Sequence, residues 1–235
     1  MSRFPPDTIG FKTSPQNAEW PVLDETWAAA AELRAFSAGW MNDHLTDLSA
    51  DGGPSFEALT LMAALAHRVP GVWVGHAVLS NTFRHPAALA KAATVLDHVT
   101  AGRFVLGLGA GWHEGEHRSL GIPLPPIRER IDRLESAVAT VRALFSSAAA
   151  APPGVTRDDR HYPLDAAVKT LRRRSLRVGP RCFSEAKDGA ASRSRGVRAM
   201  AGSSPASTPG TTATSPASGT RCCAPWRPQD ARRSP

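Results

Sequence analysis

Four candidate strands alternate with four candidate helices between residues 9 and 144, and this alternation limits the possible folds more than any other feature of the chain. Such alternation is typical of an α/β domain built around a parallel sheet. Because parallel strands leave a barrel sheet at the same edge, residues at the four strand exits should lie together. The expected strands are Ile9–Lys12, Ala38–Met41, Val72–Leu79 and Phe104–Leu108. The expected helices are Asp24–Phe36, Phe56–Val69, Pro86–Val99 and Ile127–Leu144.

Local residue patterns support these assignments. The segment Val72–Leu79 is a nearly continuous apolar run, as expected for a strand that is covered on both faces. Apolar residues recur at three- and four-residue steps through Ile127–Leu144, which predicts an amphipathic helix. Asp24 is suited to cap a helix, and Pro86 is suited to the first turn of one.

The charge of the chain divides after Val168. Up to that residue there are 14 Lys and Arg against 18 Asp and Glu, whereas from Lys169 onward there are 14 against 3. The first part is therefore acidic and the second is strongly basic. All three cysteines lie in the second part, so the first part has neither a disulfide nor a thiolate metal site. This cysteine usage, and a start without a secretory apolar run, predict a cytoplasmic protein.

The second part, residues 169–235, is rich in Arg, Ser, Ala, Pro and Gly and poor in large apolar residues. Such a composition buries too little apolar area to offset the entropy lost on ordering. We therefore expect one α/β segment over residues 1–168 and a disordered basic tail over residues 169–235.

Three stretches of the first part resemble the luciferase-like oxidoreductase family. They are IGFKTSPQNAEWP with GWMNDHL, the run from Val78 to His117, and the run from Gly121 to Phe145 followed by RHYPLDAA. The middle stretch carries the most specific combination. Its members are Arg84-His85-Pro86, Leu96-Asp97, Gly102-Arg103 and the glycine loop Gly107–Trp112.

The resemblance implies a TIM-type (β/α)8 barrel that transfers hydride, or oxygenates a small organic substrate, with a flavin or a deazaflavin. A closed barrel has eight βα units and takes about 250 residues. We therefore expect this chain to hold about four units, with impaired cofactor binding and activity. The opening Phe11–Gln16 and the pair Asp43-His44 resemble the branch that uses the deazaflavin coenzyme F420. The alternative cofactor is flavin mononucleotide (FMN).

The catalytic candidates are His44 and Asp43, which follow the second expected strand. A histidine can give or take a proton near neutral pH, and an adjacent carboxylate could fix its tautomer or stay with the polar loop. The resemblance implies that His44 lies beside the ring of the cofactor. The alternative is a loop pair without chemistry.

The resemblance also implies cofactor-binding residues at the exits of the third and fourth strands. It places a non-proline cis peptide at Ala77–Val78, behind the ring. Without the resemblance, this segment would read as an ordinary buried strand. The expected cofactor-binding residues are Ala77, Val78, Ser80, Asn81, Gly109, Ala110, Gly111 and Trp112.

Two other patterns give weaker predictions. The glycine loop could be mistaken for a dinucleotide fingerprint, but it lies after the fourth strand and has no convincing acidic partner about 20 residues on. His113, Glu114, Glu116 and His117 surround this loop and invite a metal site. Without a properly placed third ligand they predict none, and a solvated loop and helix start is the better interpretation. Arg84 could meet an anion at a helix start or pair with a carboxylate.

The basic tail leaves two further hypotheses open. One is that the chain is a noncatalytic half barrel whose tail binds nucleic acid nonspecifically through phosphate contacts. The other is that the tail is an out-of-frame translation. If GC-rich codons specify Pro180–Lys187, the same nucleotides read in a shifted frame could encode a strand that ends in glycines. We expect a small-molecule substrate, no specific nucleic acid and no membrane. The exposed strand edges of a half barrel would also allow the chain to self-associate.

Overall fold

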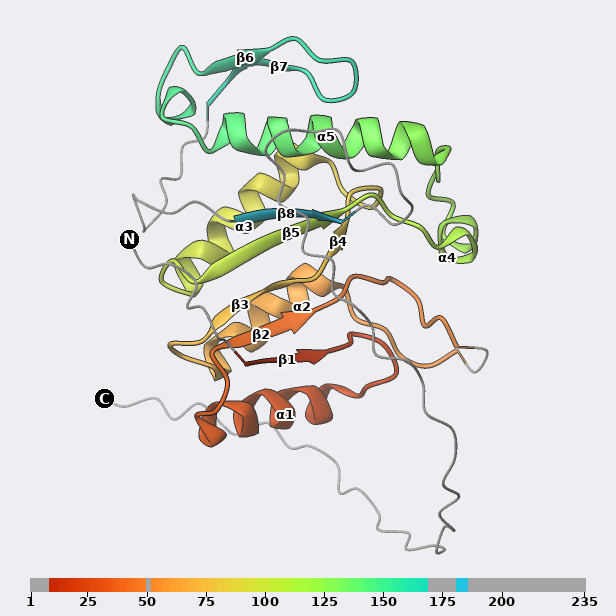
Figure 1. Ribbon diagram of the computed structural model, residues 1–235, viewed down its shortest axis with the longest axis vertical. Helices are drawn as coiled ribbons and strands as arrows, with labels where there is room; N and C mark the ends of the chain where they lie inside the picture. Colours follow the sequence, from red (N-terminus) through yellow and green to blue (C-terminus); the bar gives the residue numbers. More distant parts are fainter. Residues whose placement is uncertain (1–8, 50–51, 169–180, 186–235) are drawn as a thin grey trace, which may run out of the picture. The chain divides into compact units, whose positions relative to one another are not determined.

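The computed structural model of the chain describes residues 9–49, 52–168 and 181–185. Figure 1 shows its helices and strands. The strands are β1 (Gly10–Thr13), β2 (Ala38–Met41), β3 (Trp73–His76), β4 (Leu79–Ser80), β5 (Phe104–Gly109), β6 (Val155–Arg157), β7 (Leu164–Ala167) and β8 (Arg181–Glu185). The helices are α1 (Trp20–Leu33), α2 (Ala58–Leu65), α3 (Pro86–Val99), α4 (Glu114–Ser119) and α5 (Ile127–Leu144), with 3₁₀ turns η1 (Ala66–Arg68) and η2 (Ala148–Ala150).

The main sheet is parallel and follows the order of the sequence, as predicted. Its order is β1-β2-β3-β5, and the short β4 pairs with the carboxyl end of β5. The predicted third strand is interrupted at Ala77–Val78, where the peptide bond is cis, as the resemblance implied. This interruption separates β3 from β4 and turns the chain at the exit of the strand.

A sixth parallel strand, β8, pairs with β5 along Arg181–Glu185. The expectation that residues 169–235 lack regular structure is therefore wrong for these five residues. The hypothesis of an out-of-frame tail predicted no barrel strand here, so β8 counts against it. Strand β8 also covers one edge of β5, which belongs to the edges that a half barrel was expected to leave exposed. The predicted disorder of residues 169–180 and 186–235 falls outside the described residues.

The first two helices start at other residues than predicted, because residues at or before the first turn determine where each helix begins. The first helix starts at Trp20 rather than at Asp24, because a proline in its first turn favours a helix start after Glu19. Asp24 instead forms an ion pair with Arg68. Helix α2 starts only after Glu57, whose carboxylate accepts a hydrogen bond from the backbone N–H of Thr60 at 2.6 Å. Helices α3 and α5 have the predicted bounds.

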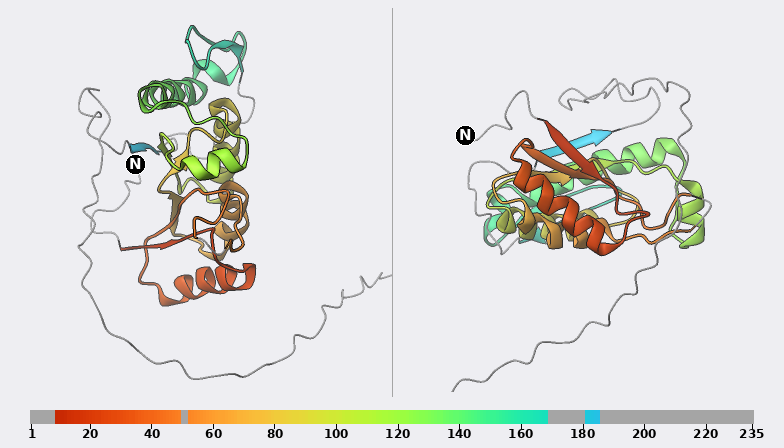
Figure 2. Two further views of the ribbon diagram at one scale, coloured as in Figure 1. Left: turned by 90° about the vertical axis from the view of Figure 1, so that its right-hand side faces the viewer. Right: turned by 90° about the horizontal axis from the view of Figure 1, so that it is seen from below.

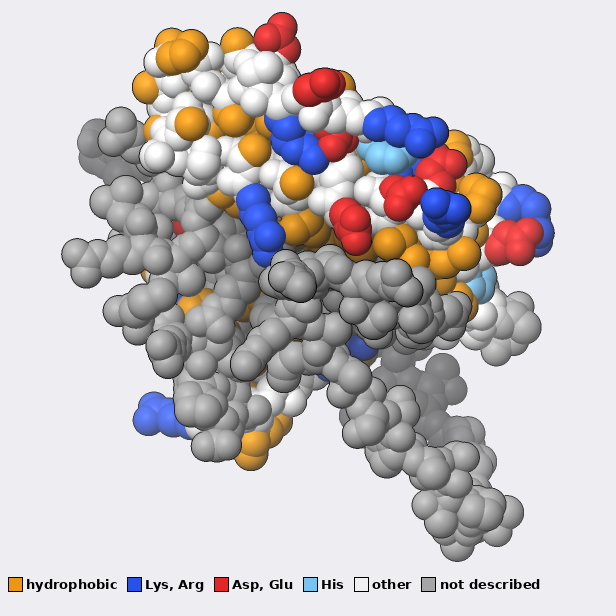
Figure 3. Space-filling model, turned by 45° about the horizontal axis from the view of Figure 1, so that its top comes forward, with side chains coloured by type: hydrophobic (Ala, Val, Ile, Leu, Met, Phe, Trp, Pro, Cys, Tyr) orange, Lys and Arg blue, Asp and Glu red, His pale blue; other side chains and the backbone are white. Residues whose placement is uncertain are grey.

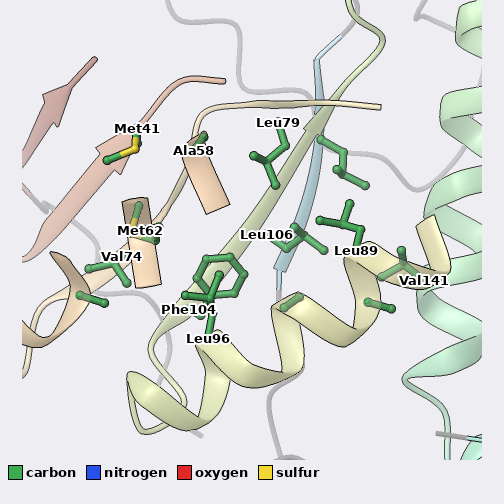
Figure 4. Packing of buried hydrophobic residues seen from close by; sticks show 14 of the residues in the cluster. Met41, Ala58, Met62, Val74, Leu79, Leu89, Leu96, Phe104, Leu106 and Val141 are labelled. Carbon is green, nitrogen blue, oxygen red and sulfur yellow. The ribbon is translucent and has the colours of Figure 1, made fainter. Parts of the chain in front are cut away.

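The face of the sheet toward the helices carries the main hydrophobic core. Figure 4 shows side chains of β2, β3 and β5 meeting those of α2 and α3, and Figure 2 shows these helices on one side of the strands. Phe104, Leu106 and Leu108 alternate along β5 and are buried against this layer. Alternation along a strand sends every second side chain to the same face, so the intervening residues of β5 belong to the opposite face.

That opposite face, which would be the interior of a closed barrel, holds a smaller apolar cluster of Ala38, Trp73 and Val105 with the partly buried Trp40. Glycines make room for the Trp40 ring on both neighbouring strands. A Cβ atom built on Gly10 would lie 2.9 Å from Nε1 of Trp40, and one on Gly75 would lie 3.1 Å from its Cζ3. The indole therefore fills the interior beneath the strand exits.

One helix and one pair of strands that precede Lys169 were not predicted. The short helix α4 follows the glycine loop, and its first backbone turn is capped by His113, whose Nδ1 accepts a hydrogen bond from the N–H of Glu116 at 3.0 Å. After α5, the strands β6 and β7 form an antiparallel pair. Helix α4 contributes directly to the site described next.

Candidate functional site

A cavity of about 530 Å³ lies at the carboxyl ends of the strands, where barrel enzymes place their chemistry. Its walls come from the exits of β1, β2, β3, β4 and β5 and from α4 and α5. The volume is in the range of ordinary small-molecule sites. The residues that line it are Lys12, Asn42, Asp43, His44, Ala77, Val78, Ser80, Phe83, Gly109, Ala110, Gly111, Trp112, His113, Glu116, His117, Ile127 and Arg130.

The predicted convergence of the strand exits is thus observed. All the residues expected at the site line this cavity except Asn81. The side chain of Asn81 is buried elsewhere, and its Nδ2 donates a long hydrogen bond of 3.4 Å to the hydroxyl of Tyr162. The alternation of side chains along β4 turns Ser80 toward the cavity and its neighbour away from it.

His44 pairs with a residue that sequence reasoning had placed near the pocket but given no role. Its Nδ1 lies 3.0 Å from Oε2 of Glu116, whose side chain is 1% exposed. An ionised carboxylate can only accept, so Nδ1 of His44 carries the proton. The other ring nitrogen, Nε2, is then the atom with a free lone pair when the ring is neutral.

Glu116 is held ionised by the loop that follows β2. Its Oε1 accepts hydrogen bonds from the backbone N–H groups of Leu45 at 2.5 Å and Thr46 at 3.1 Å. Burial alone would raise the pKa of Glu116, but the hydrogen bonds from His44, Leu45 and Thr46 bring that pKa below its ordinary value. The carboxylate therefore fixes both the tautomer of His44 and the path of the loop.

Asp43 has a different partner from the one that its position beside His44 suggested. Its buried carboxylate accepts two hydrogen bonds from Arg84, at 2.5 and 2.9 Å, and one from the backbone N–H of Ser80 at 2.8 Å. Arg84 also forms an ion pair with Glu57. Asp43 therefore ties the exit of β2 to β4, which is a positioning role, and the anion-binding interpretation of Arg84 is replaced by its carboxylate pairs.

Small residues form the wall on the β3–β5 side. The cis peptide Ala77–Val78 and the run Gly109–Gly111 present little more than backbone to the cavity. Gly111 has a φ of +79°, and a Cβ atom there would lie 2.5 Å from Oγ1 of Thr82. A flat ligand could approach this wall closely because no long side chain projects from it.

Aromatic and cationic groups form the remaining walls. The Trp112 ring, 53% exposed, meets the His44 ring edge to face with centroids 5.9 Å apart. Nη1 of Arg130 donates to the carbonyl oxygen of Gly111, which anchors the glycine loop to α5. Lys12 reaches the cavity from β1. The sequence analysis named neither Lys12 nor Arg130 as a residue of the site. The alternation of Phe11 and Lys12 along β1 could have indicated that Lys12 faces the cavity side of the sheet.

Within residues 9–49, 52–168 and 181–185, no group of three or more His, Cys, Asp or Glu side chains is placed to hold a metal ion. Over the same part of the chain, no helix is both long and apolar enough to cross a membrane.

Comparison with known proteins finds relatives by sequence. The chain is 33% identical over 140 residues to the F420-dependent glucose-6-phosphate dehydrogenase of Amycolatopsis mediterranei, a match that covers 59% of this chain and 42% of the relative. It is 33% identical over 162 residues to the protein of the same name from Kribbella flavida, covering 68% of this chain and 47% of the relative. The chain thus spans about half the length of the curated relatives it matches.

Solved structures share the fold at lower identity. An F420-dependent secondary alcohol dehydrogenase in complex with an F420-acetone adduct superposes with a TM-score of 0.64 at 23% identity, over 75% of this chain and 51% of that one. The F420-dependent tetrahydromethanopterin reductase from Methanopyrus kandleri gives a TM-score of 0.59 at 17% identity, over 77% and 50%. The luciferase-like monooxygenase family model matches residues 13–201. The chain therefore belongs to the luciferase-like monooxygenase family.

Proposed function

We propose that the cavity holds the ring of coenzyme F420 and that His44 exchanges a proton with a small organic substrate during hydride transfer. The observation that carries this proposal is the Glu116–His44 pair at the edge of a cavity with a wall of small residues. The pair gives His44 a defined tautomer, and the wall leaves space for a planar ring beside it.

The residues present fit a planar ring system. The wall formed by Ala77–Val78 and Gly109–Gly111 exposes backbone rather than long side chains. Gly111 supports this fit, because a Cβ atom at that position would already lie 2.8 Å from Oγ of Ser80. Trp112, the residue after this wall, also lines the cavity and offers an aromatic surface for stacking.

Bound F420 would supply hydride chemistry at its C5 position. The chain itself would accept or return the proton. In the oxidation of an alcohol, Nε2 of His44 would take the hydroxyl proton while the substrate C–H bond gives up hydride, which leaves a carbonyl. In the reverse direction Nε2 returns that proton to the forming alkoxide. Glu116 stabilises the imidazolium in both directions, because its carboxylate lies 3.0 Å from Nδ1.

The names of the similar proteins favour F420 over FMN. Both dehydrogenases at 33% identity are named as F420-dependent. An FMN complex also occurs among the structural neighbours, a Baeyer-Villiger monooxygenase with a TM-score of 0.54. FMN is therefore the alternative ligand that the experiment has to include.

The test is a titration of the chain with F420 and with FMN, followed by fluorescence, combined with single-turnover hydride transfer. We expect F420 to bind more tightly than FMN. In His44→Asn we expect F420 affinity within about threefold of wild type and hydride transfer slower by about 10²- to 10⁴-fold, the usual contribution of a general acid or base. His67→Gln is the matched control, because His67 is an exposed histidine of η1.

Two results would contradict the proposal. Preferred binding of FMN would move the chain to the flavin-dependent members of the family. Equal rates for His44→Asn and His67→Gln would remove His44 from the chemistry. We expect weak affinity for either cofactor, because barrel phosphate sites commonly use loops after strands seven and eight, and the described residues contain no such strands of the main sheet.

The alternative function is a noncatalytic half barrel with a nucleic-acid-binding tail. Figure 3 shows acidic and basic side chains intermixed over α5, so that face of the described residues offers no basic patch. The excess of basic residues lies in residues 169–235, with 14 Lys and Arg against 3 Asp and Glu, so such binding would depend on that segment. A gel shift with double-stranded DNA over a salt series distinguishes the two functions, because phosphate contacts make affinity fall steeply with salt.

A further inference from the structure

Three side chains beside the cavity are joined in a row by hydrogen bonds. Oγ of Ser80 lies 2.6 Å from Oγ1 of Thr82, and Oγ1 of Thr82 lies 2.7 Å from Nε2 of His117. Ser80 and His117 both line the cavity, and His117 is 2% exposed. This row, Ser80–Thr82–His117, takes no part in the proton exchange assigned to His44.

The direction of these hydrogen bonds follows from the far end of the row. Nδ1 of His117 lies 2.7 Å from the backbone carbonyl oxygen of His113, and a carbonyl can only accept. Nδ1 therefore carries a proton, and Nε2 of the neutral ring must accept one from Thr82. The single hydroxyl hydrogen of Thr82 is then used in the bond to His117. Oγ1 of Thr82 can therefore only accept a hydrogen bond from the hydroxyl of Ser80. The oxygen of Ser80 is left with lone pairs for the cavity.

A second proton on His117 reverses the whole row. Nε2 then carries hydrogen and donates to Thr82, because an imidazolium has no acceptor. Thr82 in turn donates to Ser80, and the Ser80 hydroxyl hydrogen is released toward the cavity. The same oxygen thus changes from an acceptor to a donor without any movement of heavy atoms.

Packing holds the row in place from two sides. The backbone of Gly111 lies so close that a Cβ atom would come within 2.8 Å of both hydroxyl oxygens. The ring of Phe83 lies against the ring of His117 with centroids 4.9 Å apart. These two contacts flank the row, whose Ser80 end faces the cavity.

We propose that the protonation state of His117 decides, through Thr82, whether Ser80 accepts a hydrogen bond from the bound ligand or donates one to it. With His117 neutral, Ser80 selects an N–H or O–H group of the ligand. With His117 protonated, it selects a carbonyl or an anionic oxygen. The proposal rests on the proposed function only in taking the ligand to be the F420 ring.

Other titratable groups line the same cavity and must be separated from His117. From α4 and the residue before it come Glu116 and His113, and from the exit of β2 come Asp43 and His44. The cations are Lys12 of β1 and Arg130 of α5. Glu116 is committed to His44 and the β2 loop, and Asp43 to Arg84 and Ser80 N–H. His44 and His113 are the other imidazoles that line the cavity, so the binding experiment is repeated in His44→Asn and in His113→Asn.

The first experiment needs no cofactor. Ring nitrogens of ¹⁵N-histidine-labelled protein are recorded by NMR between pH 5 and 8 in wild type, Thr82→Val and Thr94→Val. We expect neutral His117 to carry its proton on Nδ1, and Thr82→Val to shift its Nε2 resonance. Thr94→Val is the matched control, because the buried Thr94 hydroxyl donates to the carbonyl of Ala90 within α3. A neutral His117 with the proton on Nε2, or an Nε2 resonance that Thr82→Val leaves unchanged, would overturn the proposal.

The second experiment measures F420 affinity by fluorescence over the same pH range. Wild-type affinity should change by about three- to tenfold between pH 5 and 8, the value of one hydrogen bond gained or lost. This dependence should disappear in His117→Gln, whose amide takes up no proton, and persist in His44→Asn and His113→Asn. Measurable binding with the same pH profile in His117→Gln and wild type would overturn the proposal. Failure of wild type to bind F420 or FMN would refute the proposed function instead, and the NMR result would then decide about the row.

Discussion

Replacing Glu116 by glutamine should move the proton on His44 from one ring nitrogen to the other. The amide oxygen of the new side chain can still accept from the backbone N–H groups of Leu45 and Thr46. Its NH₂ group then faces Nδ1 of His44, which has to become the acceptor. The proton of the neutral ring therefore moves to Nε2, and Nε2 can no longer take a proton from a substrate.

The size of the effect on stability follows from the three hydrogen bonds that Glu116 accepts. Hydrogen bonds to an ionised group contribute about 1 kcal/mol more than neutral ones, so three of them predict a loss of about 2–3 kcal/mol. For a domain of this size, that loss corresponds to a decrease in Tm of about 4–12 °C.

The pH dependence of this loss is a separate check. The folded-state pKa of Glu116 lies below its unfolded value, so its contribution to stability is complete above the unfolded pKa of about 4.3. That contribution is lost as the pH falls from there through the folded pKa. The difference in unfolding free energy between wild type and Glu116→Gln should thus be constant above about pH 5 and shrink at lower pH.

Urea denaturation at pH 7, 5 and 4, together with ¹⁵N NMR of the His44 ring, measures these quantities. Glu114→Gln is the matched control, because Glu114 lies two residues away with a side chain that is 83% exposed. We expect Glu114→Gln to match wild type in stability and in the His44 tautomer. The reasoning is refuted if Glu116→Gln is as stable as this control at pH 7, or if its His44 still carries the proton on Nδ1.

Three further perturbations test other parts of the site and the core. Asp43→Asn should lower the unfolding free energy in urea by about 3 kcal/mol, because it leaves a buried arginine partly unpaired, whereas Asp24→Asn at a more exposed pair should cost about 1 kcal/mol or less; equal losses would contradict this. Gly111→Ala should lower Tm more than Gly121→Ala, since both have positive φ but only Gly111 has no space for a Cβ atom. Burial lowers the pKa of His76 to about 4, so wild type should lose up to about 3 kcal/mol of stability as the pH falls from 6.5 to 4. His76→Met should lack this part of the pH dependence, and parallel pH profiles for the two proteins would show that His76 does not titrate as described.

The sequence by itself determined the parallel sheet, the order of its strands and the edge at which the site lies. These features depend on local periodicity and on chain connectivity, which are written in consecutive residues. The apolar run Val72–Leu79 and the three- and four-residue steps of Ile127–Leu144 are examples. The resemblance added the cis peptide at Ala77–Val78, which no periodic pattern predicts.

Only the tertiary structure decided which polar groups pair at that edge. Asp43 lies beside His44 in the chain, yet it pairs with Arg84, 41 residues away, while His44 pairs with Glu116, 72 residues away. A buried carboxylate takes whichever donors the packed strands and loops bring within reach, and neighbours in sequence have no advantage in this. The turn of Asn81 toward Tyr162 and the pairing of β8 with β5 have the same origin, since each depends on contacts between segments that the sequence keeps far apart.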